Sequence, residues 1–186
     1  DKTLAGYPFN LDKAKQLIAD STAAKGATVT LSLPSGDTVR QQIATIAKDQ
    51  WSKIGITLNI ENLESSTLRQ NRKDGKIAMS PGGWTNDMND PTEVCNAVLK
   101  GDISPFASYS FYDNKELDDK ITQADLEQDA VKRGATYAQI QKIFLDDAPN
   151  VFIAYPPATA GWQKYVDGFA IDGLSYYRFE EVQLKK

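Results

Sequence analysis

The chain has 186 residues, of which 41% are hydrophobic and 25% are charged, and its formal net charge is −4 at pH 7. This length suffices for one domain with a substantial core, and no apolar run reaches the roughly 20 residues that a membrane-spanning helix needs. The acidic balance, without a basic cluster, argues against a nucleic-acid partner.

The reactive residue types that are present exclude several kinds of catalytic and metal-binding site. Histidine is absent, which excludes Ser-His-Asp and Cys-His centres and imidazole metal ligands. The single cysteine, Cys95, cannot form an intrachain disulfide or a thiolate zinc cluster, and its apolar helical surroundings predict a buried, inert thiol. We therefore expect no cofactor and no metal site. Any catalysis would depend on carboxylate, Lys, Tyr or Ser side chains.

The first residues precede any periodic segment. Asp1 does not begin a signal-peptide pattern, and the turn residues Gly6 and Pro8 come before the first helix, so we expect a piece of a longer protein. Asn10 then has the residue type of a helix N-cap, and the apolar residues after it recur with the spacing of an amphipathic helix. These residues are Leu11, Ala14, Leu17 and Ile18.

Two alternating segments, 29–33 and 56–60, have the two-residue period of half-buried strands. Between them, Thr38 and Gln41 have the spacing of a capping box, and Gly55 is placed to end the helix that the box begins. The apolar stripe of this predicted helix consists of Val39, Ile43, Ile46, Ala47, Trp51 and Ile54.

A short helix at 66–71 and a third strand at 76–80 are predicted to follow. The order strand, helix, strand, helix, strand implies right-handed crossovers between parallel strands. We therefore predict an α/β fold in which a mixed, largely parallel sheet is flanked by helices. The loop after the third strand would then lie at the carboxyl end of the sheet, where open α/β sheets bind ligands.

This loop, residues 82–91, reads Gly-Gly-Trp-Thr-Asn-Asp-Met-Asn-Asp-Pro. Asp90 and Pro91 have the residue types of an N-cap and of the first position of a helix. That assignment leaves Trp84, with its flat apolar ring, and Asp87, with its negative charge, without a structural role. A structural reading is also open, with Trp84 as an anchor of the loop and Asp87 capping the backbone of its own turn.

The next part of the chain is predicted to contain a helix at 91–100 and irregular structure at 101–112. The irregular segment carries Tyr109, Phe111 and Tyr112, for which anchoring in the core is favoured over a place in a ligand cleft. Asp113 and Glu116 then have capping-box spacing at the start of a further helix. The apolar residues of that helix are Leu117, Ile121 and Ala124.

A longer helix is predicted to end near Pro149, with Val131, Ala135, Ala138, Phe144 and Leu145 as its apolar residues. The run at 151–155 is continuously apolar, as is typical of a strand that is buried on both faces. The tail from Tyr165 alternates loosely, which favours one more strand.

Six short motifs connect the chain to a known family. They are Ala14-Lys15-Gln16-Leu17, Val29-Thr30-Leu31, Trp51-Ser52-Lys53-Ile54-Gly55-Ile56, Gly83-Trp84-x-x-Asp87-x-x-Asp90-Pro91, Asp146-Asp147-Ala148-Pro149 and Val166-Asp167-Gly168-Phe169. In this order and spacing, over nearly the whole chain, they resemble the extracellular solute-binding proteins of peptide/nickel-type ABC transporters.

The resemblance implies a periplasmic-binding-protein-like lobe from a longer protein whose two lobes close over a ligand. Residues 1–164 resemble the second, C-terminal lobe, and residues 165–186 resemble the segment that returns to the first lobe. The resemblance also implies a monomer without enzymatic activity, located in the periplasm or lipid-anchored at the cell surface. Such a protein delivers a peptide or another small-molecule ligand to the membrane permease of an ABC transporter.

The resemblance further implies the residues of a ligand site. In peptide-binding relatives the aspartate of the Trp-x-x-Asp segment pairs with the α-ammonium group of the ligand, and here that position is Asp87. Charge-assisted hydrogen bonds of this kind contribute about 1.5–3 kcal/mol each, and an unpaired buried carboxylate would reject ligands without an amine. Trp84 and Gly83 would shape the wall, and Asn86 and Asn89 would bond a main-chain-like ligand. Sugars and nickel chelates remain alternative ligands.

Two other functions stay open from the residues themselves. A carboxylate-based glycoside hydrolase would use Asp87 and Asp90 as an acid/base pair, although no nucleophile accompanies them. A ligand-sensing receptor would present its closed form to a membrane signalling protein and would not be coupled to uptake.

Overall fold

The computed structural model describes residues 3–22, 24–101 and 110–185. These residues form two units. The first comprises 3–83 and 110–113, and the second comprises 84–101 and 114–185. The division therefore falls within the glycine-tryptophan loop, between Gly83 and Trp84. None of the helices in the described residues is both long enough and apolar enough to cross a membrane.

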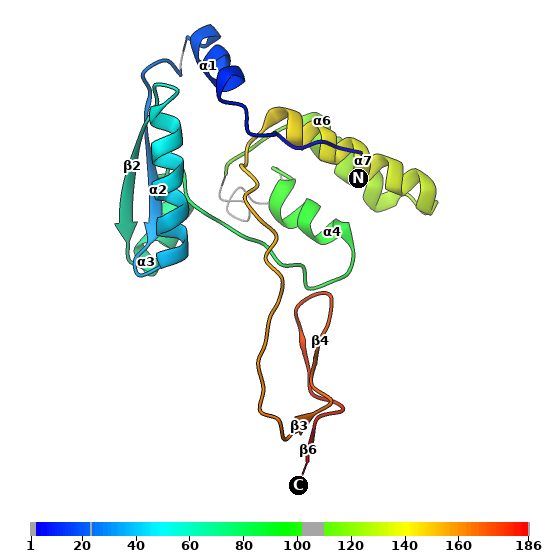
Figure 1. Ribbon diagram of the computed structural model, residues 1–186. Coiled ribbons are helices and arrows are strands. Elements are labelled where there is room, and N and C mark those ends of the chain that lie inside the picture. The colour runs from blue at the N-terminus through cyan, green and yellow to red at the C-terminus, as the bar shows by residue number, and fades with distance from the viewer. Residues whose placement is uncertain (1–2, 23, 102–109, 186) are drawn as a thin grey trace. The chain divides into compact units, whose positions relative to one another are not determined.

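The first unit is built around a parallel pair of strands. β1 (Thr28–Pro34) and β2 (Thr57–Leu63) pair along their whole length, with Thr28 opposite Thr57 and Pro34 opposite Leu63. A parallel pair needs a crossover connection, and α2 (Thr38–Ser52) supplies it, lying along the strands in Figure 1. α1 (Leu11–Asp20) precedes the pair and α3 (Ser65–Lys73) follows it.

The core of the first unit lies between the strand pair and α2. Because alternate residues of a strand face the same side, the apolar positions of β1 and β2 meet the apolar stripe of the helix. The buried members are Leu31, Leu33, Ala44 and Leu58, and Val29, Ala47, Trp51, Ile60 and Met79 pack around them. The predicted third strand at 76–80 is reduced to a single parallel bridge between Met79 and Leu31. The predicted α/β class with a parallel sheet is confirmed.

In the first unit, capping residues determine where the helices begin and end. The Asn10 side chain accepts the Lys13 N–H at 2.8 Å, as predicted for α1. The predicted cap of α2, Thr38, is wrong, because the carboxylate of Asp37 accepts the Arg40 N–H at 2.8 Å and takes the N-cap one residue earlier. Gly55 has φ 80°, the left-handed conformation that glycine adopts past the end of a helix.

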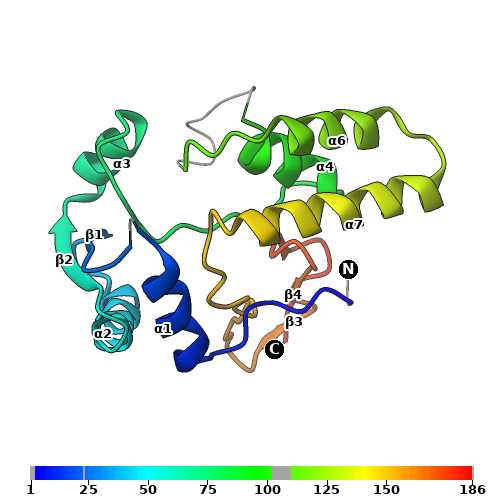
Figure 2. The same ribbon diagram turned by 90° about the horizontal axis from the view of Figure 1, so that it is seen from above.

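The second unit is mainly helical. α4 (Pro91–Val94) continues into the π-helical turn η1 (Cys95–Leu99), so the helix predicted at 91–100 changes its hydrogen bonding half-way. α6 (Lys115–Leu126) and α7 (Ala130–Asp147) lie side by side and pack through a buried set of side chains (Figure 2). This set consists of Leu117, Ile121, Ala124, Tyr137, Ile140 and Phe144. Cys95 is buried as predicted.

Two details of these helices differ from the predictions. Asn114, and not Asp113, caps α6, because its side-chain oxygen accepts the Leu117 N–H at 3.1 Å. Val131, which was predicted among the apolar residues of α7, stands in the first turn of the helix and is 82% exposed. α7 ends as expected before Pro149, where Ala148 adopts a left-handed conformation with φ 48°.

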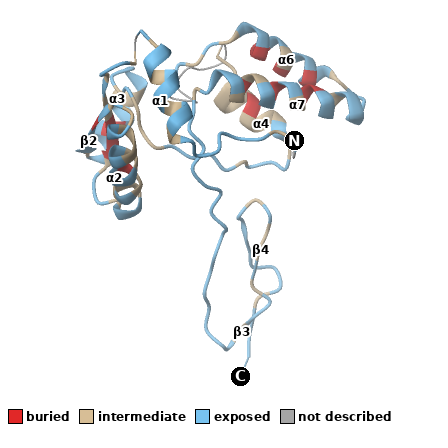
Figure 3. Ribbon diagram, turned by 45° about the horizontal axis from the view of Figure 1, so that its top comes forward, coloured by how far each residue is buried: buried red, intermediate tan, exposed pale blue. Residues whose placement is uncertain are grey.

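The segment after α7 is exposed (Figure 3). The strand predicted at 151–155 is wrong: these residues form no strand, and Val151 and Tyr155 are 74% and 86% exposed. An apolar run becomes a buried strand only where a neighbouring strand accepts it, and the described residues offer none here.

The tail predicted to hold one strand holds four short ones. β3 (Val166–Asp167) pairs with β6 (Gln183–Leu184), and β4 (Ala170–Ile171) pairs with β5 (Tyr177–Arg178), both in antiparallel orientation. The ring of Phe169 lies among three other aromatic rings, with centroid separations of 5.1 to 5.8 Å. These rings belong to Trp162, Tyr177 and Phe179. Tilted contacts between aromatic rings thus link the parts of a segment that has little buried surface.

Candidate functional site

The C-terminal end of the loop is the start of α4. The Asp90 side chain accepts the Thr92 N–H at 2.8 Å, and Pro91 occupies the first helical turn. Both structural roles predicted for this pair are confirmed. Pro91 suits this position because its missing N–H would have no partner within the helix.

Asp90 is also held by a side chain from α7. The Arg133 guanidinium donates to both carboxylate oxygens of Asp90, at 2.7 and 3.0 Å. The same group donates to the Thr92 hydroxyl at 2.7 Å and to the Tyr137 hydroxyl at 2.9 Å. The planar fork of arginine suits such a bidentate contact, and here it fastens the loop to α7 across 43 residues of sequence.

The pairing with Arg133 determines the protonation state of Asp90. The hydrogen bonds from Arg133, and then those from Thr92, hold the pKa of the Asp90 carboxyl far below its usual range. The same contact raises the pKa of Arg133, mainly because the hydrogen bond to Asp90 stabilises the charged guanidinium. A carboxylate that stays charged and has both oxygens bonded cannot deliver a proton as a general acid. Asp90 therefore has a structural role and no place in an acid/base pair.

Glu93 holds the centre of the loop. One of its carboxylate oxygens accepts the backbone N–H groups of Asp87 and Met88, at 2.7 and 2.8 Å. Glu93 stands three residues after the cap Asp90, which is the spacing of a capping box, although its side chain reaches back beyond the cap residue. That spacing is a sequence signal from which Glu93 could have been predicted.

Asp87, the residue expected to bind the ligand, is exposed at the surface of the second unit. Its carboxylate oxygen Oδ1 accepts a hydrogen bond from the Tyr176 hydroxyl at 3.0 Å. This bond, followed by burial and by the charges of nearby carboxylates, raises the pKa of Tyr176 above its usual value, so the phenol stays protonated at neutral pH. No local sequence pattern points to Tyr176, because 89 residues separate it from Asp87.

The other predicted site residues are placed differently. Trp84 is 47% exposed, which leaves its ring open to a ligand. The Asn86 amide donates to the backbone oxygen of Asp90 at 3.2 Å, so this side chain supports the loop. Asn89 is exposed. Gly83 belongs to the first unit, where it lines a hollow with three arginines and where an added Cβ would meet no atom within 4 Å.

The aromatic segment before α6 is only partly described, and Tyr109 lies outside the described residues. Phe111 belongs to the first unit and has φ 52°, an unusual conformation for a residue with a side chain. Its ring lies over Gly75, where an added Cβ would be 3.5 Å from the ring atom Cζ. The residue is nevertheless 45% exposed, so the predicted anchoring in the core is wrong for Phe111.

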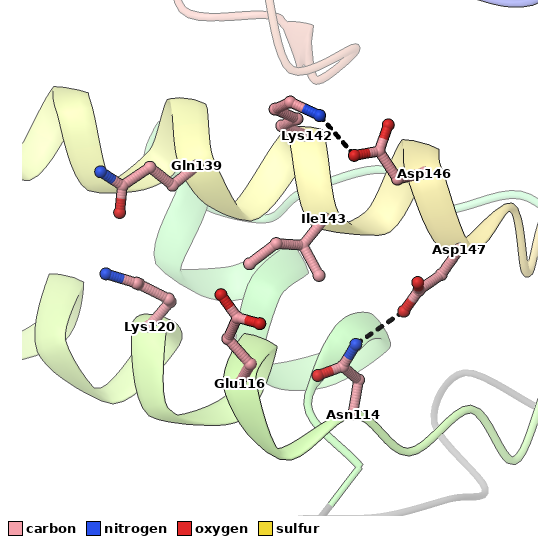
Figure 4. Close-up of a pocket in the computed structure, with 8 residues that line it drawn as sticks. All are labelled: Asn114, Glu116, Lys120, Gln139, Lys142, Ile143, Asp146 and Asp147. Atoms are coloured by element: carbon pink, nitrogen blue, oxygen red, sulfur yellow. Dashed lines mark hydrogen bonds and ion pairs between the residues drawn. The ribbon is translucent and has the colours of Figure 1, made fainter.

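The second unit also has a groove between α6 and α7 (Figure 4). Its charged side chains largely bond with one another or with neighbours on the groove wall. Lys142 pairs with Asp146, and the Asn114 amide donates to Asp147 at 2.6 Å. Ligand pockets are mostly apolar with few polar groups, so this groove is a poor candidate. The described residues contain no group of three or more side chains suited to a metal ion.

Comparison with known proteins identifies the chain. Residues 1–105 match the family described as bacterial extracellular solute-binding proteins, family 5, in its middle part. The match covers more than half of the 186 residues. The chain belongs to this family. Family 5 proteins are solute-binding proteins and not enzymes, which sets aside the hydrolase and agrees with the state of Asp90.

Several of the similar proteins are named for peptide ligands, and others for different ligands, such as heme-binding protein A of Haemophilus influenzae. The chain is 29% identical over 185 residues to the dipeptide-binding protein of Escherichia coli K12, across 96% of this chain and 34% of that protein. It is 28% identical over 175 residues to a probable D,D-dipeptide-binding periplasmic protein of the same organism, across 94% of this chain and 34% of that protein.

A solved structure has the same fold as this chain. It is an ABC-transporter-associated periplasmic binding protein from Helicobacter pylori in complex with the peptide STSA. The TM-score is 0.87 at 27% identity, and the match covers 99% of this chain and 36% of that chain. The family 5 chain described here therefore spans about a third of the length of these relatives.

Proposed function

We propose that residues 1–164 form the C-terminal ligand-binding lobe of a peptide-capturing solute-binding protein, and that residues 165–186 lead back to its first lobe. The ligand is a short peptide with a free amino terminus. Relatives named as dipeptide-binding and di/tripeptide-binding proteins support this ligand class. The protein would be an extracytoplasmic monomer that passes its ligand to the membrane permease of an ABC transporter, and relatives named as periplasmic proteins support this location.

The state of Asp87 carries the proposal. Asp90 and Glu93 are both committed to structure, whereas Asp87 is an exposed carboxylate on a backbone that Glu93 holds in place. A preorganised carboxylate loses little conformational entropy when it takes a cation. Three residues earlier in the loop, the partly exposed side chain of Trp84 could offer an apolar and aromatic surface to the first side chain of a peptide or to its ammonium group.

Capture would work by closure of two lobes. A ligand that touches both lobes stabilises the closed form by the free energy of those contacts, which shifts the population toward it. Closure also removes water from Asp87, and this strengthens its bond to an ammonium group and penalises a ligand without one. The chain described here would then hold only part of the contacts.

Asp87→Asn tests the role of the carboxylate. Replacing it in the full-length protein removes the charge and keeps the shape, and we expect the affinity for the dipeptide Ala-Phe to fall by about ten- to a hundredfold, as for loss of a hydrogen bond to a charged group. Isothermal titration calorimetry measures the loss.

Asp12→Asn is the matched control, the same change at an exposed aspartate of α1 outside the loop, and should leave the affinity within about threefold. An Asp87→Asn protein that binds Ala-Phe as tightly as the wild type would contradict the proposal. Native mass spectrometry of the full-length protein would identify a ligand carried through purification, and a neutral sugar there would also count against a peptide.

A receptor that senses the same ligand shares all of this chemistry. Loss of peptide uptake in a deletion strain supports transport, whereas loss of a signalling response with uptake intact supports sensing.

A further inference from the structure

Tyr176 makes a contact that the predicted site does not include. It lies in the turn between β4 and β5, and its hydroxyl donates to Oδ1 of Asp87 at 3.0 Å. Asp172 fixes this turn: its carboxylate accepts the N–H groups of Leu174 and Tyr176 at 2.9 and 3.0 Å, and its own N–H donates to the Tyr176 carbonyl at 3.0 Å. The hydroxyl therefore comes from a braced backbone.

Asp87 is thereby held at two points. Glu93 accepts its backbone N–H at 2.7 Å, and Tyr176 donates to one of its two carboxylate oxygens. Within the described part of the chain, the other oxygen, Oδ2, has no hydrogen bond or ion pair. A carboxylate offers about four lone-pair positions, so the phenol occupies one and leaves Oδ2 for a ligand.

We propose that Tyr176 is a positioning residue for amine recognition: its hydroxyl orients the Asp87 carboxylate so that Oδ2 faces the ligand's ammonium group. This role rests on the proposed function. An ammonium group has three donors, and one of them can bond Oδ2 while the phenol keeps Oδ1 in place. The arrangement predicts that the site selects peptides with a free amino terminus. It also predicts that Tyr176 contributes little to binding of the rest of the peptide.

The surrounding charges favour the same ligand. Glu93 and Asp172 lie close enough to Tyr176 to raise its pKa together with Asp87, so three carboxylates place negative charge near the phenol. Arg178 approaches Asp172 only at 3.8 Å and is 55% exposed, which screens this charge weakly. A cation is therefore attracted to this end of the loop.

Tyr176→Phe tests the role, because it removes the hydroxyl and keeps the ring. Binding of Ala-Phe and of N-acetyl-Ala-Phe to the full-length protein is measured by calorimetry, directly or in competition. We expect the affinity for Ala-Phe to fall by about tenfold and that for the acetylated peptide to stay unchanged. Tyr177→Phe is the matched control, the same change one residue away, and should alter neither.

A double-mutant cycle separates positioning from direct contact and from folding. If Tyr176 acts through Asp87, adding Tyr176→Phe to Asp87→Asn causes no further loss of affinity for Ala-Phe. Equal losses for both peptides, an unchanged preference for the free amine, or tighter binding of Ala-Phe would each overturn the role of Tyr176. A wild-type protein that does not distinguish the two peptides would overturn the proposed function itself.

Discussion

At the scale of single residues, three carboxylates between positions 87 and 93 have three different roles. Asp90 is paired with Arg133 and caps α4, Glu93 holds two backbone N–H groups, and Asp87 remains exposed with a phenol on one oxygen. In the sequence, only the N-cap pattern distinguishes the structural role of Asp90 from the expected ligand-binding role of Asp87. It could not reveal Arg133 or Tyr176 as partners, because each lies far along the chain.

The ion pair of Asp90 gives a pH-dependent prediction. Arg133→Met should lower the urea midpoint of the chain at pH 7, because it leaves the carboxylate and the Tyr137 hydroxyl without their donor. The folded-state pKa of Asp90 is depressed, so its stabilisation is fully present above its unfolded value of about 3.9 and is lost as the pH falls through the folded pKa. The difference between variant and wild type should therefore shrink below about pH 4.

The matched control is Arg178→Met, since the ion pairs of Arg178 are long, at 3.5 and 3.8 Å, and exposed. Its urea midpoint should match that of the wild type. A midpoint for Arg133→Met that is equal to the wild type at pH 7 would show that the pair contributes nothing to stability.

At the scale of elements, local signals predicted the helices and tertiary contacts decided the strands. Asn10 marks the start of α1 and Gly55 follows the end of α2, as predicted, because capping depends only on neighbouring residues. Residues 76–80 and 151–155 have strand patterns, yet the first makes one bridge and the second makes none. A strand exists only where another strand pairs with it, and its own residues do not specify that partner.

Two glycines in different settings test this account of the helices. Gly55→Ala should lower the free energy of unfolding by about 1 kcal/mol or more, because alanine is strained at φ 80°. Gly134→Ala, inside α7 with no atom within 4 Å of the added Cβ, should raise it by about 0.5–1 kcal/mol. Urea unfolding measures both, and changes of the same sign would contradict the account.

At the scale of the whole molecule, an exposed apolar stretch stands out. Residues 151–165 are all exposed and form no regular structure, although 151–155 are continuously apolar. The chain spans about a third of its relatives' length, and we propose that parts of the longer protein cover this stretch. Its partner there would be a strand, since a continuous apolar run suits a strand that is buried on both faces.

Amide hydrogen exchange tests whether residues 151–155 are covered in the full-length protein. We expect the amides of 151–155 to exchange rapidly in the 186-residue chain and to be protected in the full-length protein. The buried helix α6 is the internal control and should be protected in both. Equally fast exchange of 151–155 in the two proteins would show that the stretch stays uncovered.

The sequence by itself determined the family, the α/β class, most helix bounds and the loop that carries Asp87, because these depend on local periodicity, capping chemistry and motif order. Only the tertiary structure decided that Asp90 pairs with Arg133 and that the Tyr176 hydroxyl bonds Asp87. It also decided that 151–155 is not a strand in this chain. The physical reason is common to all three: each depends on whether a partner distant in sequence reaches hydrogen-bonding distance, and no local pattern encodes that.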